Sequence, residues 1–427
     1  MRARPVIPAS PVTRGIRSIR KNLFGSLPDS ALSILTAIII YLIFLGGDPA
    51  GQLIALITLD WPDLLGSGLL GFVFDSADWD IVNANRRLYF IFRFPGEETW
   101  RLWIILYLLS GLGGVSAGLW TRITWQVGAA FAFLMIPVFS LIGGGDVALL
   151  TAGTIGAFAL GYLVASVGTS RGLHVSAARN VLVGAWILAF LFAMYLLNGV
   201  DSRLWGGLLL TLVVSVVGIV ASFPLGVLLA LGRASSFPVV RIFCTAYIEI
   251  IRAVPLITIL FMALFFLPLM LEPDRSLVGV PLTGQTWLEL DVVLRAMVAV
   301  TLFSSAYIAE NVRGGLQSVA RGQVEAAQAL GLSTPRVLAS IVLPQAIRAV
   351  IPSIVGQFIS LFKDTSLLFI MGLTDLLEVA GIVTSQPAFI GRQAESLLFV
   401  ALIYWIITFS MSQASQRLER TLGVGER

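Results

Sequence analysis

The sequence has very few of the residues from which disulfides, metal sites and most catalytic centres are built. It contains one cysteine, Cys244, and one histidine, His174. A single cysteine excludes an internal disulfide and a multi-cysteine metal site. We expect Cys244 to be a small apolar residue within a membrane span and His174 to lie in a polar loop beside Arg171 and Arg179. A membrane-embedded enzyme is therefore disfavoured, and no catalytic or metal-ligating residue is assigned.

Charged residues are also scarce. Only 12% of the 427 residues are charged, whereas 57% are hydrophobic and the mean hydropathy is +0.92. A soluble chain of this length could not bury so much apolar surface, so the composition predicts an all-α polytopic protein whose surroundings are the lipid bilayer. The formal net charge of +4 does not indicate a nucleic-acid partner, because the arginines lie between apolar segments.

Ten apolar segments are predicted as transmembrane helices, and the basic loops between them alternate. The segments are about residues 30–45, 103–120, 127–142, 147–167, 181–197, 205–231, 242–271, 292–312, 347–371 and 397–412. With the basic loops inside, both termini lie in the cytoplasm. The predicted organisation is a cytoplasmic basic tail at 1–29, a five-span extension at 30–200 with an aqueous outer segment at about 48–101, and a five-span core at 201–427 with a cytoplasmic loop at about 313–346.

Two short patterns within these segments leave alternatives open. Residues 52–74 are apolar but interrupted by Asp60, Pro62 and Asp63, which indicates either an interfacial segment or a re-entrant hairpin. Gly114 and Gly118 have the spacing that lets membrane helices approach closely, although this spacing also arises by chance in apolar spans. Four prolines could either permit helix bending or be tolerated at span ends: Pro255, Pro268, Pro344 and Pro352.

The loop at about 313–346 reads as a polar helical hairpin. Good helix formers at 323–330 make an apolar stripe, and Gly331 offers the freedom that a helix end needs. The stripe is Ala326, Ala327 and Leu330. Thr334 is expected to cap a second helix with Pro335 at its first position, and Pro344 to end or kink that helix. Such a hairpin could lie on the bilayer surface or serve as a handle for a soluble partner.

The spacing in this hairpin resembles the EAA loop of ABC-transporter permeases. The pattern is Glu-Ala-Ala, a glycine four residues on, and Ile-x-Leu-Pro after nine more residues. It is complete at Glu325, Ala326, Ala327, Gly331, Ile341, Leu343 and Pro344. The resemblance implies coupling helices that dock in a groove of a separate ATPase. It also agrees with the absence of a Gly-x-x-x-x-Gly-Lys-Ser/Thr phosphate-binding loop from this sequence.

The resemblance extends over residues 205–427, which look like the five-span core of polar amino-acid ABC permeases. The matching stretches are 205–208, 247–256, 305–315 and 363–367. The extra N-terminal spans resemble one of two permease subunits of the broad-specificity L-amino acid and glutamate/glutamine/aspartate/asparagine type. The family implies a type I ABC importer permease of the bacterial inner membrane, with the segment at 48–101 in the periplasm. The implied partners are a second related permease, an ABC ATPase dimer that binds ATP and Mg²⁺, and a periplasmic amino-acid-binding protein.

Several charged residues interrupt the apolar spans. A charge at mid-bilayer costs about 3 kcal/mol or more, so each needs a reason. Glu249, Arg252 and Arg313 are interpreted as structural ion-pair residues. For a zwitterionic amino acid, Glu310 and Asp364 could accept from the ammonium group. Donors to its carboxylate could come from Ser304, Ser305, Lys363, Thr365 and Ser366.

The same intramembrane charges leave a second function open. A secondary amino-acid transporter driven by a proton or sodium gradient would also use acidic residues within its spans. Such a carrier has no need of a complete docking motif, so the hairpin favours the ATP-driven importer. A subunit that only gates the path, without binding substrate, is a further alternative.

Overall fold

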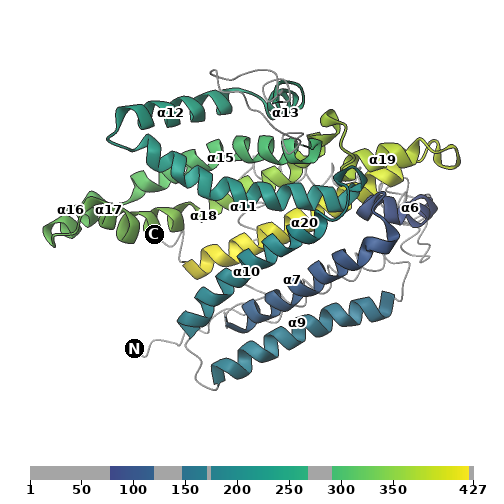
Figure 1. The fold of residues 1–427 in the computed structure, drawn as a ribbon, viewed down its shortest axis with the longest axis horizontal. Helices are drawn as coiled ribbons and strands as arrows, with labels where there is room; N and C mark the ends of the chain where they lie inside the picture. The colour runs from purple at the N-terminus through teal and green to yellow at the C-terminus, as the bar shows by residue number, and fades with distance from the viewer. Residues whose placement is uncertain (1–76, 120–146, 171–174, 268–290, 423–427) are drawn as a thin grey trace, which may run out of the picture. The chain divides into compact units, whose positions relative to one another are not determined.

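The computed structural model describes residues 77–119, 147–170, 175–267 and 291–422. The chain divides into two compact units, Met1–Trp79 and Asp80–Arg427, and every named helix belongs to the second. All elements in the described ranges are helical (Figure 1), and the β-type pairing recorded there is an isolated parallel bridge between Gly207 and Asp375. The all-α expectation is confirmed. The predicted spans at 30–45 and 127–142, the segment 52–74 and His174 lie outside the described residues.

Three helices of the N-terminal extension pack through small residues. They are α7 (Thr99–Leu119), α9 (Val147–Ser170) and α10 (Val175–Leu197), with α7 in contact with both others. A Cβ atom added to Gly114 would lie 2.1 Å from the Phe158 carbonyl oxygen, and one added to Gly118 would lie 2.6 Å from the Ala165 Cβ. Of the two alternatives left open for the glycine spacing, the structure shows the close helix contact.

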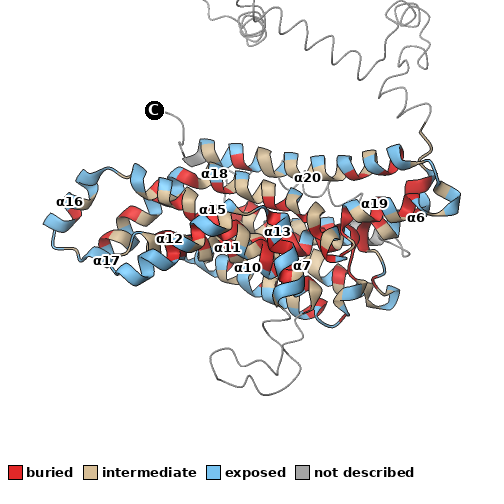
Figure 2. Ribbon diagram, turned by 90° about the horizontal axis from the view of Figure 1, so that it is seen from above, coloured by how far each residue is buried: buried red, intermediate tan, exposed pale blue. Residues whose placement is uncertain are grey.

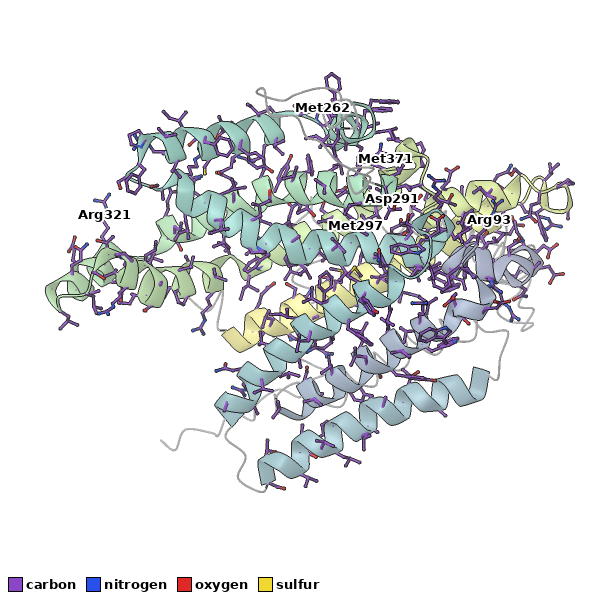
Figure 3. The ribbon with its side chains drawn as sticks, in the orientation of Figure 1. Arg93, Met262, Asp291, Met297, Arg321 and Met371 are labelled. Carbon is purple, nitrogen blue, oxygen red and sulfur yellow. The ribbon has the colours of Figure 1, made fainter. Side chains whose placement is uncertain are left out.

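Four long helices make the C-terminal core. They are α11 (Gly207–Arg233), α15 (Val292–Ser318), α18 (Leu343–Asp364) and α20 (Gln393–Leu422). Helices α11 and α15 run parallel: Ser202, just before α11, donates to Asp291, which precedes α15 and is labelled in Figure 3, while Arg233 at the end of α11 pairs with Glu310. We call the end of the core near Arg233 the hairpin end and the end near Gly207 the far end.

The predicted span at 242–271 is a bent pair of helices within the described residues. It is split into α12 (Pro238–Ala253) and a second piece, α13 (Leu256–Phe261) with the π-helical turn η4 (Met262–Phe266), and the two pieces are bent by 108°. The break falls at Pro255, which has no N–H to continue the helix. Val254 before it is extended, with φ −106° and ψ 135°, as a residue preceding proline prefers.

Seven helices in the described ranges are long and apolar enough to cross a membrane. The number of candidate spans is eight if the bent pair of α12 and α13–η4 is one span. These agree in position with eight of the ten predicted spans. The other two predicted spans are those outside the described residues, so the total of ten stays a prediction.

Short helices gather at the far end. They are α6 (Asp80–Ile91), η2 (Gly96–Glu98), η3 (Ser202–Leu204), η6 (Thr365–Met371), α19 (Leu376–Thr384) and η7 (Pro387–Phe389). Helix α6 comes from the segment expected to be aqueous, yet it packs against α11, α19 and α20. Its sequence is amphipathic, so one face is buried in the core while charged side chains such as Arg86 stay exposed.

Candidate functional site: the coupling hairpin and the charged residues of the spans

The hairpin projects from the end of the bundle as two short helices joined at Gly331. The first is α16 (Arg321–Ala329), and the second is α17 (Thr334–Val337) with the π-helical turn η5 (Leu338–Val342). Gly331 has φ +78°, its N–H donates to the Gln328 carbonyl at 2.9 Å, and the Leu332 N–H donates to the Ala327 carbonyl at 3.2 Å. These two bonds form a Schellman motif, which needs a residue in the left-handed region and so favours glycine.

A small apolar core holds the two helices together. Ala327, Val337 and Val342 are buried, and partly buried side chains pack around them: Leu316, Val319, Val324, Leu332, Leu338 and Ile341. Ala327 and Ile341 of the motif thus face inward, and Leu343 is half-buried. Glu325, Ala326 and Pro344 are exposed. The motif therefore combines residues that shape the hairpin with residues that remain on its surface (Figure 2).

Leu330 is the apolar residue at the tip of the hairpin and is 82% exposed. The predicted stripe placed it with Ala326 and Ala327, but only Ala327 turns inward. Leu330 follows the last helical residue, where the chain turns into the Schellman motif and no longer follows the 3.6-residue period. The Leu330 side chain is therefore not covered by the core of the hairpin.

Two details of the predicted hairpin are corrected. The N-cap of the second helix is Ser333 rather than Thr334, and it makes no side-chain capping bond. Pro344 does not end the helix: it lies in the first turn of α18, directly after the π-helical turn η5. As a result α17, η5 and α18 run on as one helical path from Thr334 into the following membrane span.

A network of ion pairs joins three helices at the hairpin end. The Glu310 carboxylate of α15 accepts from Arg313 Nε at 3.0 Å and lies 3.4 Å from Arg233 Nη1 and 3.7 Å from Arg252 Nη1. Arg233 of α11 also pairs with Glu249 of α12 at 2.9 Å. Arg252 lies over the Tyr307 ring, with its guanidinium carbon 5.7 Å from the ring centroid. Each of these side chains is partly exposed.

Glu249, Arg252 and Arg313 each take part in an ion pair, as interpreted from the sequence. For Glu249 and Arg252, however, the partners differ from the expected ones. Glu249 and Arg252 pair with residues of other helices rather than with each other. Arg233 was missed as a member, because it follows a long apolar run and is 77 residues from Glu310 in the sequence.

Three of the proposed carboxylate donors are buried in the helix packing. Ser304 is 1% exposed, and Ser305 and Thr365 are 0% exposed. Ser305 donates to the Leu302 carbonyl at 2.7 Å and lies 3.1 Å from the Tyr247 hydroxyl, and Thr365 donates to the Phe362 carbonyl at 2.7 Å. Lys363 is exposed on this chain, and Asp364 and Ser366 are half-exposed.

Glu310 and Asp364 lie at different levels of the bundle. Leu361 of α18 and Val300 of α15 both approach Gly218 of α11, which defines one level of the bundle near Asp364. At the level of Glu310, α15 and α18 pack through other residues, namely Ile308 and Val312 against Val350 and Ile354. Asp364 is therefore about twelve residues from the level of Glu310, or roughly 18 Å along a helix. One amino-acid molecule does not span both carboxylates.

Comparisons of the sequence with known proteins identify membrane transport permeases as its relatives. The family model described as "Binding-protein-dependent transport system inner membrane component" matches residues 222–424. The chain is 44% identical to the inner membrane amino-acid ABC transporter permease protein YhdY of Escherichia coli (strain K12) over 255 residues, 58% of this chain and 66% of the relative. A solved structure titled as an amino acid ABC transporter with histidines aligns with a TM-score of 0.42 and 27% identity, over 49% of this chain and 90% of that chain.

Two further relatives are covered over most of their length. The glutamate/glutamine/aspartate/asparagine transport system permease protein BztC of Rhodobacter capsulatus is 37% identical over 362 residues, 81% of this chain and 79% of the relative. The probable glutamine ABC transporter permease protein GlnP of Bacillus subtilis is 37% identical over 216 residues, 51% of this chain and 92% of the relative. These matches do not support a gradient-driven secondary transporter. The chain belongs to the amino-acid ABC transporter permease family, as a multi-pass inner-membrane subunit that is not an enzyme and whose ATPase is a separate chain.

Proposed function

We propose that this chain imports amino acids together with a second, related permease, and that the hairpin carrying Leu330 docks on an ABC ATPase dimer. A periplasmic binding protein delivers the substrate from outside, and the partner ATPase holds ATP and Mg²⁺. Both termini and the hairpin then lie in the cytoplasm, and the far end with α6 faces the periplasm. Support for a second permease comes from the similarity to both BztC and BztB of Rhodobacter capsulatus.

The exposed tip of the hairpin carries this proposal. Helix α16 and the residue after it present Glu325, Gln328 and Leu330 to solvent, while the small core beneath keeps the hairpin in shape without a partner. A pre-shaped apolar tip can enter a groove at little conformational cost. Because the second helix continues directly into α18, a displacement of the hairpin is transmitted along α18 toward its other end.

At that other end we place the substrate path. Asp364 could accept from the substrate ammonium group, and Lys363 and Ser366 could donate to the carboxylate. All three lie at the junction of α18 and η6, so hairpin movement would reorient them. Glu310 is better explained as a structural residue, because its carboxylate already faces three arginines.

The docking proposal is tested by Leu330→Asp in the assembled complex. A charge at the tip should abolish co-purification of the ATPase and reduce ATP-driven uptake at least tenfold, because the groove would have to bury an unpaired carboxylate. Ser385→Asp, an exposed site at the far end, is the matched control and should retain both. Normal ATPase recovery with Leu330→Asp, or uptake by this chain alone that collapses with a protonophore, would overturn the proposal.

A further inference from the structure

Helix α6 has one face completely covered by the core. Ile81 and Tyr89 are 0% exposed and Phe90 is 4% exposed. Asn83, Arg86 and Arg87 lie on the other face and are exposed. Arg93, in the turn that follows α6, lies at the opposite end of the bundle from Arg321 of the hairpin (Figure 3).

Buried polar contacts fix α6 to two other elements. The Tyr89 hydroxyl lies 2.6 Å from the Ser396 hydroxyl of α20, within hydrogen-bonding distance. Gln386, after α19, donates to the Asn85 side-chain oxygen at 2.9 Å. The Tyr89 ring also meets the Phe399 ring edge to face, with centroids 5.1 Å apart. If α6 separated from the core, buried polar groups and aromatic surface would be left without partners.

The backbone of α11 begins in direct contact with α6. Gly207 has φ +58°, and a Cβ atom added there would lie 2.3 Å from the Tyr89 carbonyl oxygen. The Gly207 N–H donates to the Thr374 carbonyl at 2.9 Å, and the Leu376 N–H donates to the Thr211 hydroxyl at 3.1 Å. The starts of α11 and α19 and the end of α6 therefore meet with no space for a side chain at Gly207.

This helix lies outside the part of the chain that the family model matches, residues 222–424. The 216 aligned residues of GlnP make up 92% of that relative, so it is too short to contain an extension of this kind. BztC, in contrast, aligns with 81% of this chain. The far end of the core is therefore covered here by a segment outside the matched family region.

We propose that α6 is a fixed brace, which holds the far ends of α11, α19 and α20 together as one rigid block in every state of the transport cycle. The inference assigns a role to the N-terminal extension and rests on the proposed function only in assuming that such a cycle exists. Conformational change within this subunit then takes place outside the block, in the hairpin and α18 and at the bend between α12 and α13.

Distances between spin labels test whether the brace is fixed. Cysteines replace the exposed Asn83 of α6 and Ser385, which directly follows α19, in a Cys244→Ala background. Pulsed electron paramagnetic resonance compares the complete complex without nucleotide and with trapped ATP. The distance distribution should be the same in both states. A control pair at Gln328 and Ser385 should change. A changed distribution for the Asn83–Ser385 pair would overturn the brace.

Thermal unfolding tests the brace without relying on transport. Gly207→Ala forces a methyl group against the Tyr89 carbonyl and should lower the Tm of the complex by about 5 °C. Gly184→Ala in α10, where an added Cβ meets nothing within 4 Å, should leave the Tm unchanged. A wild-type Tm for Gly207→Ala would contradict the inference, whereas absence of ATP-driven uptake by the unaltered complex would contradict the proposed function instead.

Discussion

Three arginines share the Glu310 carboxylate at the hairpin end. In Glu310→Gln, Glu249 alone would balance Arg233, Arg252 and Arg313, and the guanidinium groups would repel one another in a partly buried setting. After allowance for solvent screening, we expect the free energy of unfolding to fall by about 2 kcal/mol. Arg313→Gln removes one of three cations and should cost less.

Thermal unfolding and substrate kinetics together separate the two interpretations of Glu310. If Glu310 is structural, Glu310→Gln lowers the Tm and leaves the KM for the amino acid near that of the unaltered complex. A raised KM with an unchanged Tm would restore Glu310 to the substrate path.

Asp375 is a buried carboxylate at the far end, between the candidate spans. Its side chain accepts from the N–H groups of Leu377 and Glu378 and caps α19. Burial raises its pKa from 3.8 to about 6, and these backbone hydrogen bonds lower it only in part. Between about pH 4 and pH 6 the folded protein therefore binds more protons than the unfolded chain, so stability falls as the pH rises through this window.

The prediction is that Asp375→Asn removes much of this pH dependence, because an asparagine caps the helix without ionising. Between pH 4.5 and pH 6.5 the Tm of the unaltered complex should fall more steeply than that of the variant. Over this range the unaltered complex should lose up to about 2 kcal/mol more of its free energy of unfolding than the variant does. Asp201→Asn, at an exposed cap, should retain the full slope. An equal slope in Asp375→Asn would show that this carboxylate is not the group that titrates.

At the scale of elements, α7 and α9 are held at short distance by glycine. A Cβ atom on Gly161 would lie 2.2 Å from the Gly111 carbonyl oxygen, whereas one on Gly156 of the same helix would meet nothing within 4 Å. Gly161→Ala should therefore lower the free energy of unfolding by about 1–3 kcal/mol. Gly156→Ala should be neutral or raise it by up to about 1 kcal/mol. Equal denaturation midpoints for the two variants would contradict a glycine-dependent contact.

Elements defined by neighbouring residues could be predicted from the sequence, and those defined by distant ones could not. The hairpin is local: Gly331 and the motif spacing predicted its two helices. The bend at Pro255 was only one of two alternatives, because proline permits a break without fixing its angle. The contacts of Arg233 with Glu310 and of Tyr89 with Ser396 join residues 77 and 307 positions apart, and no periodicity pairs them.

At the scale of the whole molecule, the proposed orientation places the hairpin and α6 on opposite sides of the membrane. The basic loops favour a cytoplasmic hairpin, because arginine-rich segments are retained inside. A membrane-impermeant maleimide should therefore label Asn83→Cys in intact spheroplasts and Gln328→Cys only after permeabilisation, both in a Cys244→Ala background. Both positions are exposed on their helices, so a lack of labelling reports the membrane barrier rather than burial. Labelling of Gln328→Cys from outside would reverse the orientation and would remove the hairpin from reach of a cytoplasmic ATPase.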